Sequence, residues 1–241
     1  MLKEIRLNAF EMNCVVHQSP GLWRHPRDAS RDYKRLPLWL DLARTLERGL
    51  FDGLFLADVL GTYDVFGGGP EAALAHGIQV PVGDPLLLVP AMAAVTEHLG
   101  FGVTVNLSYE PPFPFARRLS TLDHLTEGRI GWNIVTGYLD SAARAVGQAG
   151  QKRHDDRYEV AEDYMEAVYK LWEGSWADDA VAADPTSGVY ARPERVRPVR
   201  HDGPFFKLNS VHLSEPSPQR TPMLYQAGTS PAGRAFAARH A

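Results

Sequence analysis

The sequence is short of cysteine and of long apolar runs. Cys14 is the only cysteine in 241 residues, which excludes an internal disulfide bond and a metal site built from several thiolates. We expect Cys14 to be a small buried hydrophobic residue. No run of 18 apolar residues occurs, and the N-terminus has no apolar stretch of the kind found in secretion signals. We therefore expect a cytoplasmic protein that does not associate with membranes.

An excess of positive charge is also missing. The formal net charge is -4, with 25 basic and 29 acidic residues, so a nucleic-acid partner is not expected. The histidines are scattered, and no two of them are four residues apart as in zinc-binding helices. We expect no metal site. The apolar fraction of 44% is that of an ordinary globular protein.

Apolar spacing predicts strands that alternate with helices. The segment from 175 to 220 is rich in proline, aspartate and glycine, and we expect it to be a surface excursion with brief extended pieces at 189–190 and 205–208. Pro90 predicts a kink in the second helix. The predicted strands are 5–10, 54–57, 101–107, 130–135 and 222–227, and the predicted helices are 36–50, 86–98, 116–126, 154–174 and a last one from Pro231.

This alternation indicates a parallel sheet with right-handed crossovers. Two architectures fit, a doubly wound sheet and an eightfold barrel. In both, ligands bind at the carboxyl ends of the strands. The polar residues that follow the predicted strands are Glu11, Asn13, His17, Asp58, Thr104, Asn106, Asn133, Thr136, Gly228, Thr229 and Ser230.

Two of these positions allow a structural and a functional interpretation. The Gly228-Thr229-Ser230-Pro231 turn offers hydroxyls and backbone N–H groups at a helix start, where a phosphate dianion can bind. The same residues also make an ordinary serine N-cap. Asp58 can be a ligand or merely cap the following turn.

Another pair lies at the start of the helix from residue 154. His154 and Tyr158 are one helical turn apart, so both can reach one anion, but a solvated, charged helix start also explains them. Gly67-Gly68-Gly69 follows a polar loop, and neither a dinucleotide fingerprint nor a P-loop is present.

Four segments together resemble a known family. They are "FDGLFLADVLGTYDVFGGG", "GDPLLLVPAMAAVTEHLGFGVTVNLSYEPPFPFARRLSTLDHLTEGRIGWNIVTG", "HDDRYEVAEDYMEAVYKLWEGSW" and "PMLYQAGTSPAGRAFAARHA". In this order they are similar to the flavin-dependent monooxygenases grouped with nitrilotriacetate and dibenzothiophene-sulfone monooxygenases, within the bacterial-luciferase-like superfamily. The resemblance runs along the whole chain.

The resemblance implies an eightfold barrel that binds reduced flavin mononucleotide (FMN) at its C-terminal mouth. The implied flavin-binding residues are Asp58, Thr104, His154, Tyr158 and Ser230, with Asn133, Thr136, Gly228 and Thr229 as further members. It also implies a two-component reaction, in which a separate NAD(P)H:flavin reductase supplies reduced FMN. This reacts with O₂ to a C4a-hydroperoxide that oxygenates a small organic substrate. A homo-oligomer is expected for the full-length protein.

The chain shows only five of the eight strands that such a barrel has. We therefore expect residues 1–241 to form a single barrel-type domain that is incomplete at its C-terminal end, in a longer protein. A catalytically inactive flavin-binding or vestigial fragment is one alternative, and a deazaflavin-dependent oxidoreductase of the same superfamily is another. The sequence does not select a substrate.

Overall fold

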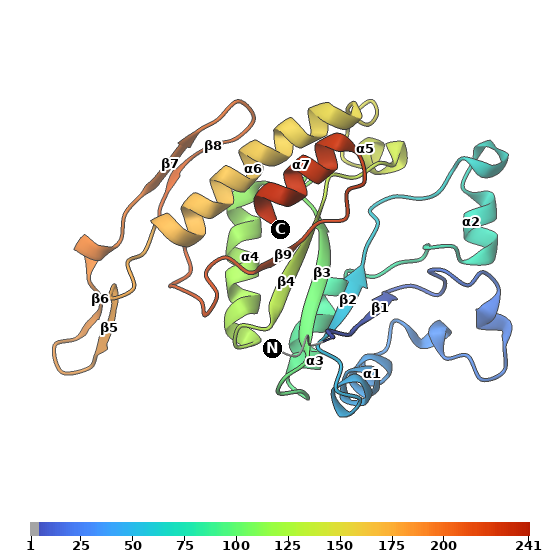
Figure 1. Cartoon of the computed structure of the whole chain (residues 1–241), viewed down its shortest axis with the longest axis horizontal. Coiled ribbons are helices and arrows are strands. Elements are labelled where there is room, and N and C mark those ends of the chain that lie inside the picture. Colours follow the sequence, from blue (N-terminus) through green and yellow to red (C-terminus); the bar gives the residue numbers. More distant parts are fainter. Residues whose placement is uncertain (1–4) are drawn as a thin grey trace.

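The computed structural model describes residues 5–241, which build a five-stranded parallel sheet with helices packed beside it (Figure 1). The sheet consists of β1 (Asn8–Met12), β2 (Gly53–Ala57), β3 (Gly100–Asn106), β4 (Ile130–Val135) and β9 (Met223–Tyr225). The α-helices are α1 (Leu36–Arg48), α2 (Glu71–His76), α3 (Val89–Ala93), α4 (Pro112–Leu125), α5 (Asp140–Ala145), α6 (His154–Gly174) and α7 (Pro231–His240).

The strands lie side by side in the order β1-β2-β3-β4-β9, and every neighbouring pair is parallel. The five predicted strands and their parallel pairing are thus confirmed, although β1 begins at Asn8 and β9 covers only three residues. The order in the sheet follows the order in the chain. A doubly wound sheet reverses its order in the middle, so the observed order is that of a barrel.

One face of the sheet is covered by helices. Leu54, Phe101 and Trp132 point into an apolar core that includes Trp39 of α1 and Phe115 of α4. The Phe115 and Trp132 ring centroids lie 4.5 Å apart. Burial of such large aromatic side chains supplies much of the stability of a domain. The continuous apolar strands of the sequence are explained by this cover.

The opposite face carries glycine and aromatic residues. A Cβ atom at Gly131 would lie 2.7 Å from the Tyr225 ring, and one at Gly102 would lie 3.2 Å from it. The Phe55 and Tyr225 rings meet edge to face at 5.8 Å. Phe10, on edge strand β1, remains 51% exposed. The aromatic rings thus lie directly over a backbone that has no side chains of its own there.

The helix starts at the C-terminal edge of the sheet agree with the sequence. The Ser230 hydroxyl accepts a hydrogen bond from the Gly233 N–H at 3.0 Å, and Pro231 occupies the first helical position of α7. Both are favourable at these positions. Helix α6 runs beside α7, where the Tyr169 hydroxyl lies 3.1 Å from His240 Nδ1 (Figure 1).

The predicted kinked helix over 86–98 is wrong. A 3₁₀ turn (Pro85–Leu88) is followed by α3, which ends at Ala93. Pro90 lies in the first turn of α3, where its missing N–H is not needed. After the helix, the Glu47 carboxylate accepts hydrogen bonds from the backbone N–H groups of Glu97 and His98. The Glu97 and His98 N–H groups therefore donate to a side chain instead of continuing the helical hydrogen bonds of α3.

Several short elements are absent from the prediction. These are α2, α5 and the two antiparallel hairpins, which pair β5 (Val181–Asp184) with β6 (Val189–Ala191) and β7 (Val199–Asp202) with β8 (Lys207–Ser210). Both hairpins lie within residues 175–220. The extended piece expected at 189–190 lies in β6, and the piece expected at 205–208 overlaps β8 only at residues 207 and 208. Within the described residues, no helix is long and apolar enough to cross a membrane.

Hairpin β7–β8 is attached to α6 by a buried carboxylate. Asp163 accepts hydrogen bonds from the backbone N–H groups of Phe205 and Phe206, each at 2.8 Å. Its other oxygen lies 2.9 Å from His201 Nε2. A carboxylate that accepts several hydrogen bonds is well satisfied when buried.

A second buried histidine gives the fold a dependence on pH. His212 Nε2 lies 3.0 Å from the Ser120 hydroxyl, and Nδ1 has no hydrogen-bond partner among the residues that the structure describes. Burial lowers the pKa of His212 from 6.5 to about 4. The unfolded chain therefore takes up a proton between these two values, while the folded chain does not.

Acidification from pH 6.5 to pH 4 should therefore cost the wild-type chain up to about 3 kcal/mol more than a His212→Gln variant. Urea unfolding of both proteins at several pH values measures the difference. Parallel stability curves of the two proteins would show that His212 does not titrate in this way.

Candidate functional site

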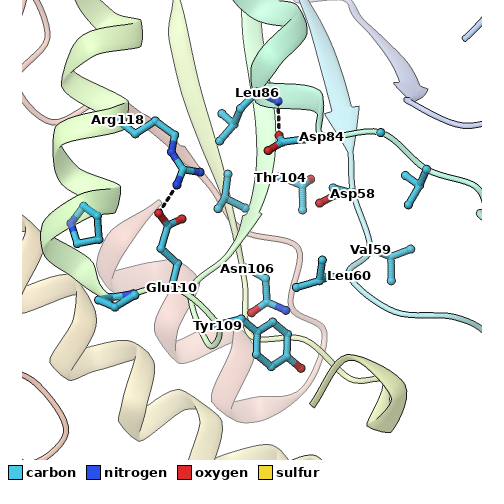
Figure 2. Close-up of a pocket in the computed structure, with 15 residues that line it drawn as sticks. Asp58, Val59, Leu60, Asp84, Leu86, Thr104, Asn106, Tyr109, Glu110 and Arg118 are labelled. Carbon is cyan, nitrogen blue, oxygen red and sulfur yellow. Dashed lines mark hydrogen bonds and ion pairs between the residues drawn. The ribbon is translucent and has the colours of Figure 1, made fainter. Parts of the chain in front are cut away.

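The carboxyl ends of the parallel strands bring several predicted site residues to one edge of the sheet. Asp58 follows β2, Thr104 lies on β3, Asn133 lies on β4, and Ser230 follows β9. A cavity of about 460 Å³ opens there (Figure 2). Its lining comes from the ends of β2 and β3, the loop before α3 and the start of α4, and consists of Asp58, Val59, Leu60, Val82, Gly83, Asp84, Leu86, Thr104, Val105, Asn106, Tyr109, Glu110, Pro111, Pro114 and Arg118.

Asp58 is the titratable group with the clearest shift in this cavity. Burial, and after it the nearby Asp84 carboxylate, raise the pKa of Asp58 to about 6, against the opposing effect of a hydrogen bond from the Val59 backbone. Figure 2 shows Asp58, Asp84 and Thr104 close together on one side. A carboxyl group with this pKa can hold or release a proton near neutral pH.

Glu110 and Arg118 form an ion pair on the side of the cavity next to α4 (Figure 2). Burial raises the pKa of Glu110 although the Arg118 guanidinium lowers it. Asp84 also caps the turn before α3, because its carboxylate accepts a hydrogen bond from the Leu86 N–H at 2.9 Å. With Asp58, the cavity presents more carboxylates than cations.

Thr104 and Asn133 form a polar pair beside the cavity. Asn133 Nδ2 donates to Thr104 Oγ1 at 2.9 Å, and both side chains are buried. The Asn133 Oδ1 atom has no hydrogen-bond partner within residues 5–241. A buried acceptor without a partner lowers the stability of the fold. The Asn133 Oδ1 atom can therefore gain a hydrogen bond from a ligand that carries an N–H group.

A second group of residues surrounds the start of α7. A Cβ atom built on Gly233 would lie 2.8 Å from the Tyr158 hydroxyl and 3.1 Å from the Ser230 hydroxyl. The Tyr158 hydroxyl also accepts a hydrogen bond from Gln226 Nε2 at 3.4 Å. Gly228 packs against Gly233, since a Cβ atom on Gly228 would lie 2.7 Å from the Gly233 Cα atom. We call this group the α7 cluster.

His154 lies next to the α7 cluster. Its ring centroid is 5.3 Å from that of Tyr158, so the predicted neighbourhood of these two residues is found. The side chain is exposed, and its Nδ1 atom lies 2.7 Å from the Asp155 carboxylate. Thr229 is exposed as well.

The structure therefore sorts the predicted residues into two groups on one sheet edge. Asp58 and Thr104 line the cavity, with Asn133 bonded to Thr104. Tyr158, Gly228 and Ser230 belong to the α7 cluster. Among residues 5–241, the cavity lining includes neither Tyr158 nor Ser230. Thr136 contributes its carbonyl group, which accepts a hydrogen bond from the Ser108 hydroxyl at 2.8 Å.

Sequence reasoning missed Glu110, Arg118 and Gln226 as neighbours of the site. Glu110 and Arg118 meet only because the loop before α4 turns back on the helix. Gln226 follows β9 directly, so its position after a strand was the available signal.

Three potential metal ligands lie together elsewhere. Ligand atoms of Asp163, Glu166 and His201 are within 4.8 Å of one another. However, the Lys170 ammonium group lies 2.6 Å from the Glu166 carboxylate and 3.1 Å from His201 Nδ1. The Lys170 ammonium group and the backbone N–H groups that donate to Asp163 thus already bind the ligand atoms that a metal ion would need. The group holds the hairpin on α6.

A sequentially ordered parallel sheet with polar groups at its C-terminal edge is typical of barrel folds, whose ligands bind at that edge. Residues 16–241 match the family described as luciferase-like monooxygenase. The chain belongs to this family, which confirms the resemblance and the barrel fold class inferred from the sequence.

Two curated relatives illustrate the match. The chain is 55% identical over 241 residues to dimethyl-sulfide monooxygenase of Hyphomicrobium sulfonivorans, covering 100% of this chain and 50% of the relative. It is 35% identical over 224 residues to nitrilotriacetate monooxygenase component A of Aminobacter aminovorans, covering 92% of this chain and 49% of the relative. The chain thus spans about half the length of these relatives.

Solved structures agree with the fold. The crystal structure of long-chain alkane monooxygenase matches with a TM-score of 0.97 at 52% identity, over 99% of this chain and 55% of that one. A riboflavin lyase structure with modified FMN and the substrate riboflavin matches with a TM-score of 0.92 at 41% identity, over 97% of this chain and 52% of that one.

The raised pKa of Asp58 predicts a stability cost. Because the folded state disfavours the ionised carboxylate, this group destabilises the fold above its pKa of about 6, and the cost disappears as the pH falls toward 3.8. An Asp58→Asn variant should therefore be more stable than the wild type at pH 7.5, by about 1 to 2 kcal/mol after allowance for the open side of the cavity.

Urea unfolding at pH 7.5 and pH 4 measures this difference. Asp156→Asn, which removes an exposed carboxylate on α6, is the control and should change little at either pH. Equal stability of wild type and Asp58→Asn at pH 7.5 would show that the ionised Asp58 carboxylate does not destabilise the fold.

Proposed function

We propose that this chain carries the flavin site of an FMN-dependent monooxygenase component of a two-component system. The observation that carries the proposal is the pairing of two groups on one sheet edge, in a chain of the luciferase-like monooxygenase family. The α7 cluster suits a phosphate, and the groups around Asp58 and Thr104 suit a polar ring. The flavin has both parts.

The α7 cluster fits a phosphate group for physical reasons. The start of α7 presents backbone N–H groups and the positive end of the helix dipole. Ser230 and Tyr158 add hydroxyl groups that can donate to phosphate oxygens. Gly228 and Gly233 carry no side chain, so a ligand can approach the backbone closely.

The ring end of the flavin fits the residues beside the cavity. The Asn133 Oδ1 atom lacks a hydrogen-bond partner in the described part of the chain and can accept a hydrogen bond from a ring N–H group. Asp58, with its pKa of about 6, can accept or return a proton in the same region. Residues Asp58, Thr104, Asn133 and Thr136 would hold the ring, and His154, Tyr158, Gly228, Thr229 and Ser230 would hold the phosphate.

Reduced flavin would supply the oxygen chemistry, because it activates O₂ and passes one oxygen atom to an organic substrate. The protein residues orient the ring, hold a proton at Asp58 and exclude water from the reacting atoms. The relative named component A supports a separate NAD(P)H:flavin reductase as partner. We also propose that the full-length protein forms a homo-oligomer.

The charge of the cavity bears on the substrate. Asp58, Asp84 and Glu110 face it, and of the described lining residues only Arg118 offers a positive charge. A neutral small molecule, such as the sulfide or alkane in the names of two relatives, meets less repulsion than a polycarboxylate. We therefore propose a neutral organic substrate.

Reduced FMN tests the proposed function directly. Purified protein should bind reduced FMN under anaerobic conditions, and the bound flavin should then reoxidise more slowly with O₂ than free reduced FMN, because water is kept from it. Stopped-flow absorbance follows the reaction. Reoxidation at the rate of free flavin would instead support an inactive fragment, and a preference for reduced deazaflavin would support the alternative oxidoreductase.

Substitution of Ser230 tests the phosphate end. Ser230→Ala should weaken FMN binding by about 1 to 2 kcal/mol, the value of a hydrogen bond to a charged group. Ser230→Asp keeps the helix cap but repels a dianion, so it should weaken FMN binding more while the melting temperature stays near the wild-type value. Fluorescence titration with FMN and riboflavin measures both effects. If Ser230→Asp binds FMN as the wild type does, the phosphate lies elsewhere.

A further inference from the structure

The loop that follows β4 is held by a buried arginine from α6. The guanidinium group of Arg157 donates to the Gly137 carbonyl oxygen through Nη1. Arg157 is only 8% exposed, and its Nε atom has no partner among the described residues. Arg157 comes directly before Tyr158 and three residues after His154, in the first turns of α6.

Gly137 is also enclosed by side chains from two other segments. A Cβ atom there would lie 2.5 Å from Asn106 Nδ2, 3.0 Å from the Tyr109 hydroxyl and 3.3 Å from Gln151 Nε2. Gln151 Nε2 donates to the Tyr109 hydroxyl at 2.6 Å. With φ at +72°, the backbone of Gly137 adopts a conformation that other residues disfavour.

The same loop forms a wall of the ring end. Gly137 lines a small second cavity of about 80 Å³ together with Asp58 and Asn106. Asp58 also lines the cavity of about 460 Å³. A contact between Gly137 and Arg157 therefore connects this wall with the helix turn that carries Tyr158 of the α7 cluster.

A purely structural purpose does not explain this arginine well. A buried guanidinium that has one carbonyl partner and an unpaired Nε loses much of its hydration energy, and a single neutral acceptor does not offset that loss. An apolar side chain of similar length would pack in the same place at lower cost. The position of the cation, between the two ends of the candidate site, gives it another use.

We propose that Arg157 is a positioning residue, which fixes the loop after β4 through the Gly137 carbonyl and so sets the spacing between the ring end and the phosphate end of the site. This inference rests on the proposed flavin site. A flavin that carries a phosphate needs both ends at the correct spacing, whereas riboflavin, which lacks the phosphate, needs only the ring end.

The ratio of the dissociation constants for riboflavin and FMN is the measurement that tests this role. Arg157→Met should weaken FMN binding at least tenfold more than riboflavin binding, because only FMN needs both ends of the site at the correct spacing; this tenfold difference corresponds to about 1.4 kcal/mol. Arg153→Met removes the same charge from an exposed position on the same helix end and should change the ratio by less than about threefold.

Gly137→Ala separates positioning from direct contact with the phosphate. It displaces the loop without removing a charge, so it should also reduce the preference for FMN. If Gly137→Ala keeps the wild-type preference while Arg157→Met loses it, Arg157 is a direct phosphate ligand and the positioning role is wrong. If Arg157→Met weakens both flavins equally together with a lower melting temperature, its role is only structural, which also contradicts the proposal.

Hydrogen exchange of the flavin-free protein provides a readout that needs no cofactor. Arg157→Met should raise exchange in the peptide that contains residues 136–140, whereas Arg153→Met should not. Unchanged exchange there would overturn the contact between Arg157 and the loop. A wild-type chain that binds neither flavin, yet shows this difference in exchange, would disprove the proposed function and leave the loop contact in place.

Discussion

Parallel hydrogen bonding between neighbouring strands is the constraint on which the rest of the structure depends. It makes β1, β2, β3, β4 and β9 end at the same edge, so residues far apart in the sequence become neighbours there. Each strand must return by a crossover, and the crossover helices cover one face of the sheet. The residues at the carboxyl ends remain free to serve a ligand, because the core does not need them.

The two faces of the sheet and its carboxyl edge have different roles. The covered face supplies the apolar burial that stabilises the fold, around Trp132 and Phe101. On the other face, Gly102 and Gly131 allow the Phe55 and Tyr225 rings to pack directly on the backbone. The edge holds groups that reduce stability, such as the carboxyl of Asp58 and the guanidinium of Arg157. Buried charged groups of this kind are typical of functional sites.

Much of this arrangement could be predicted from the sequence. Strongly apolar strands and the long stripe of α6 set the element order, and the residues just after the strands identified Asp58, Thr104 and Ser230 as site candidates. The short helices α2 and α5 and the hairpins were missed because their few apolar residues show no clear period. Pro90 misled the prediction, since a proline that starts a helix and one that kinks it look alike in sequence.

The site was harder to predict where it depends on tertiary contacts. Glu110 meets Arg118 through a turn of the chain, and Arg157 meets Gly137 across an intervening helix and loop. Neither spacing follows a local period, so no local pattern could have indicated it. The resemblance to a family supplied residues for the flavin, but the partner that holds each loop in place became visible only in three dimensions.

The central claim is that one sheet edge holds a flavin with its ring near Asp58 and Thr104 and its phosphate at the start of α7. The most direct measurement is the electron density of FMN in crystals of the protein grown with the cofactor. The account predicts phosphate oxygens within hydrogen-bond distance of the Ser230 and Tyr158 hydroxyl groups, with the ring beside Asn133. Density for the phosphate away from α7, or a ring outside this sheet edge, would contradict it.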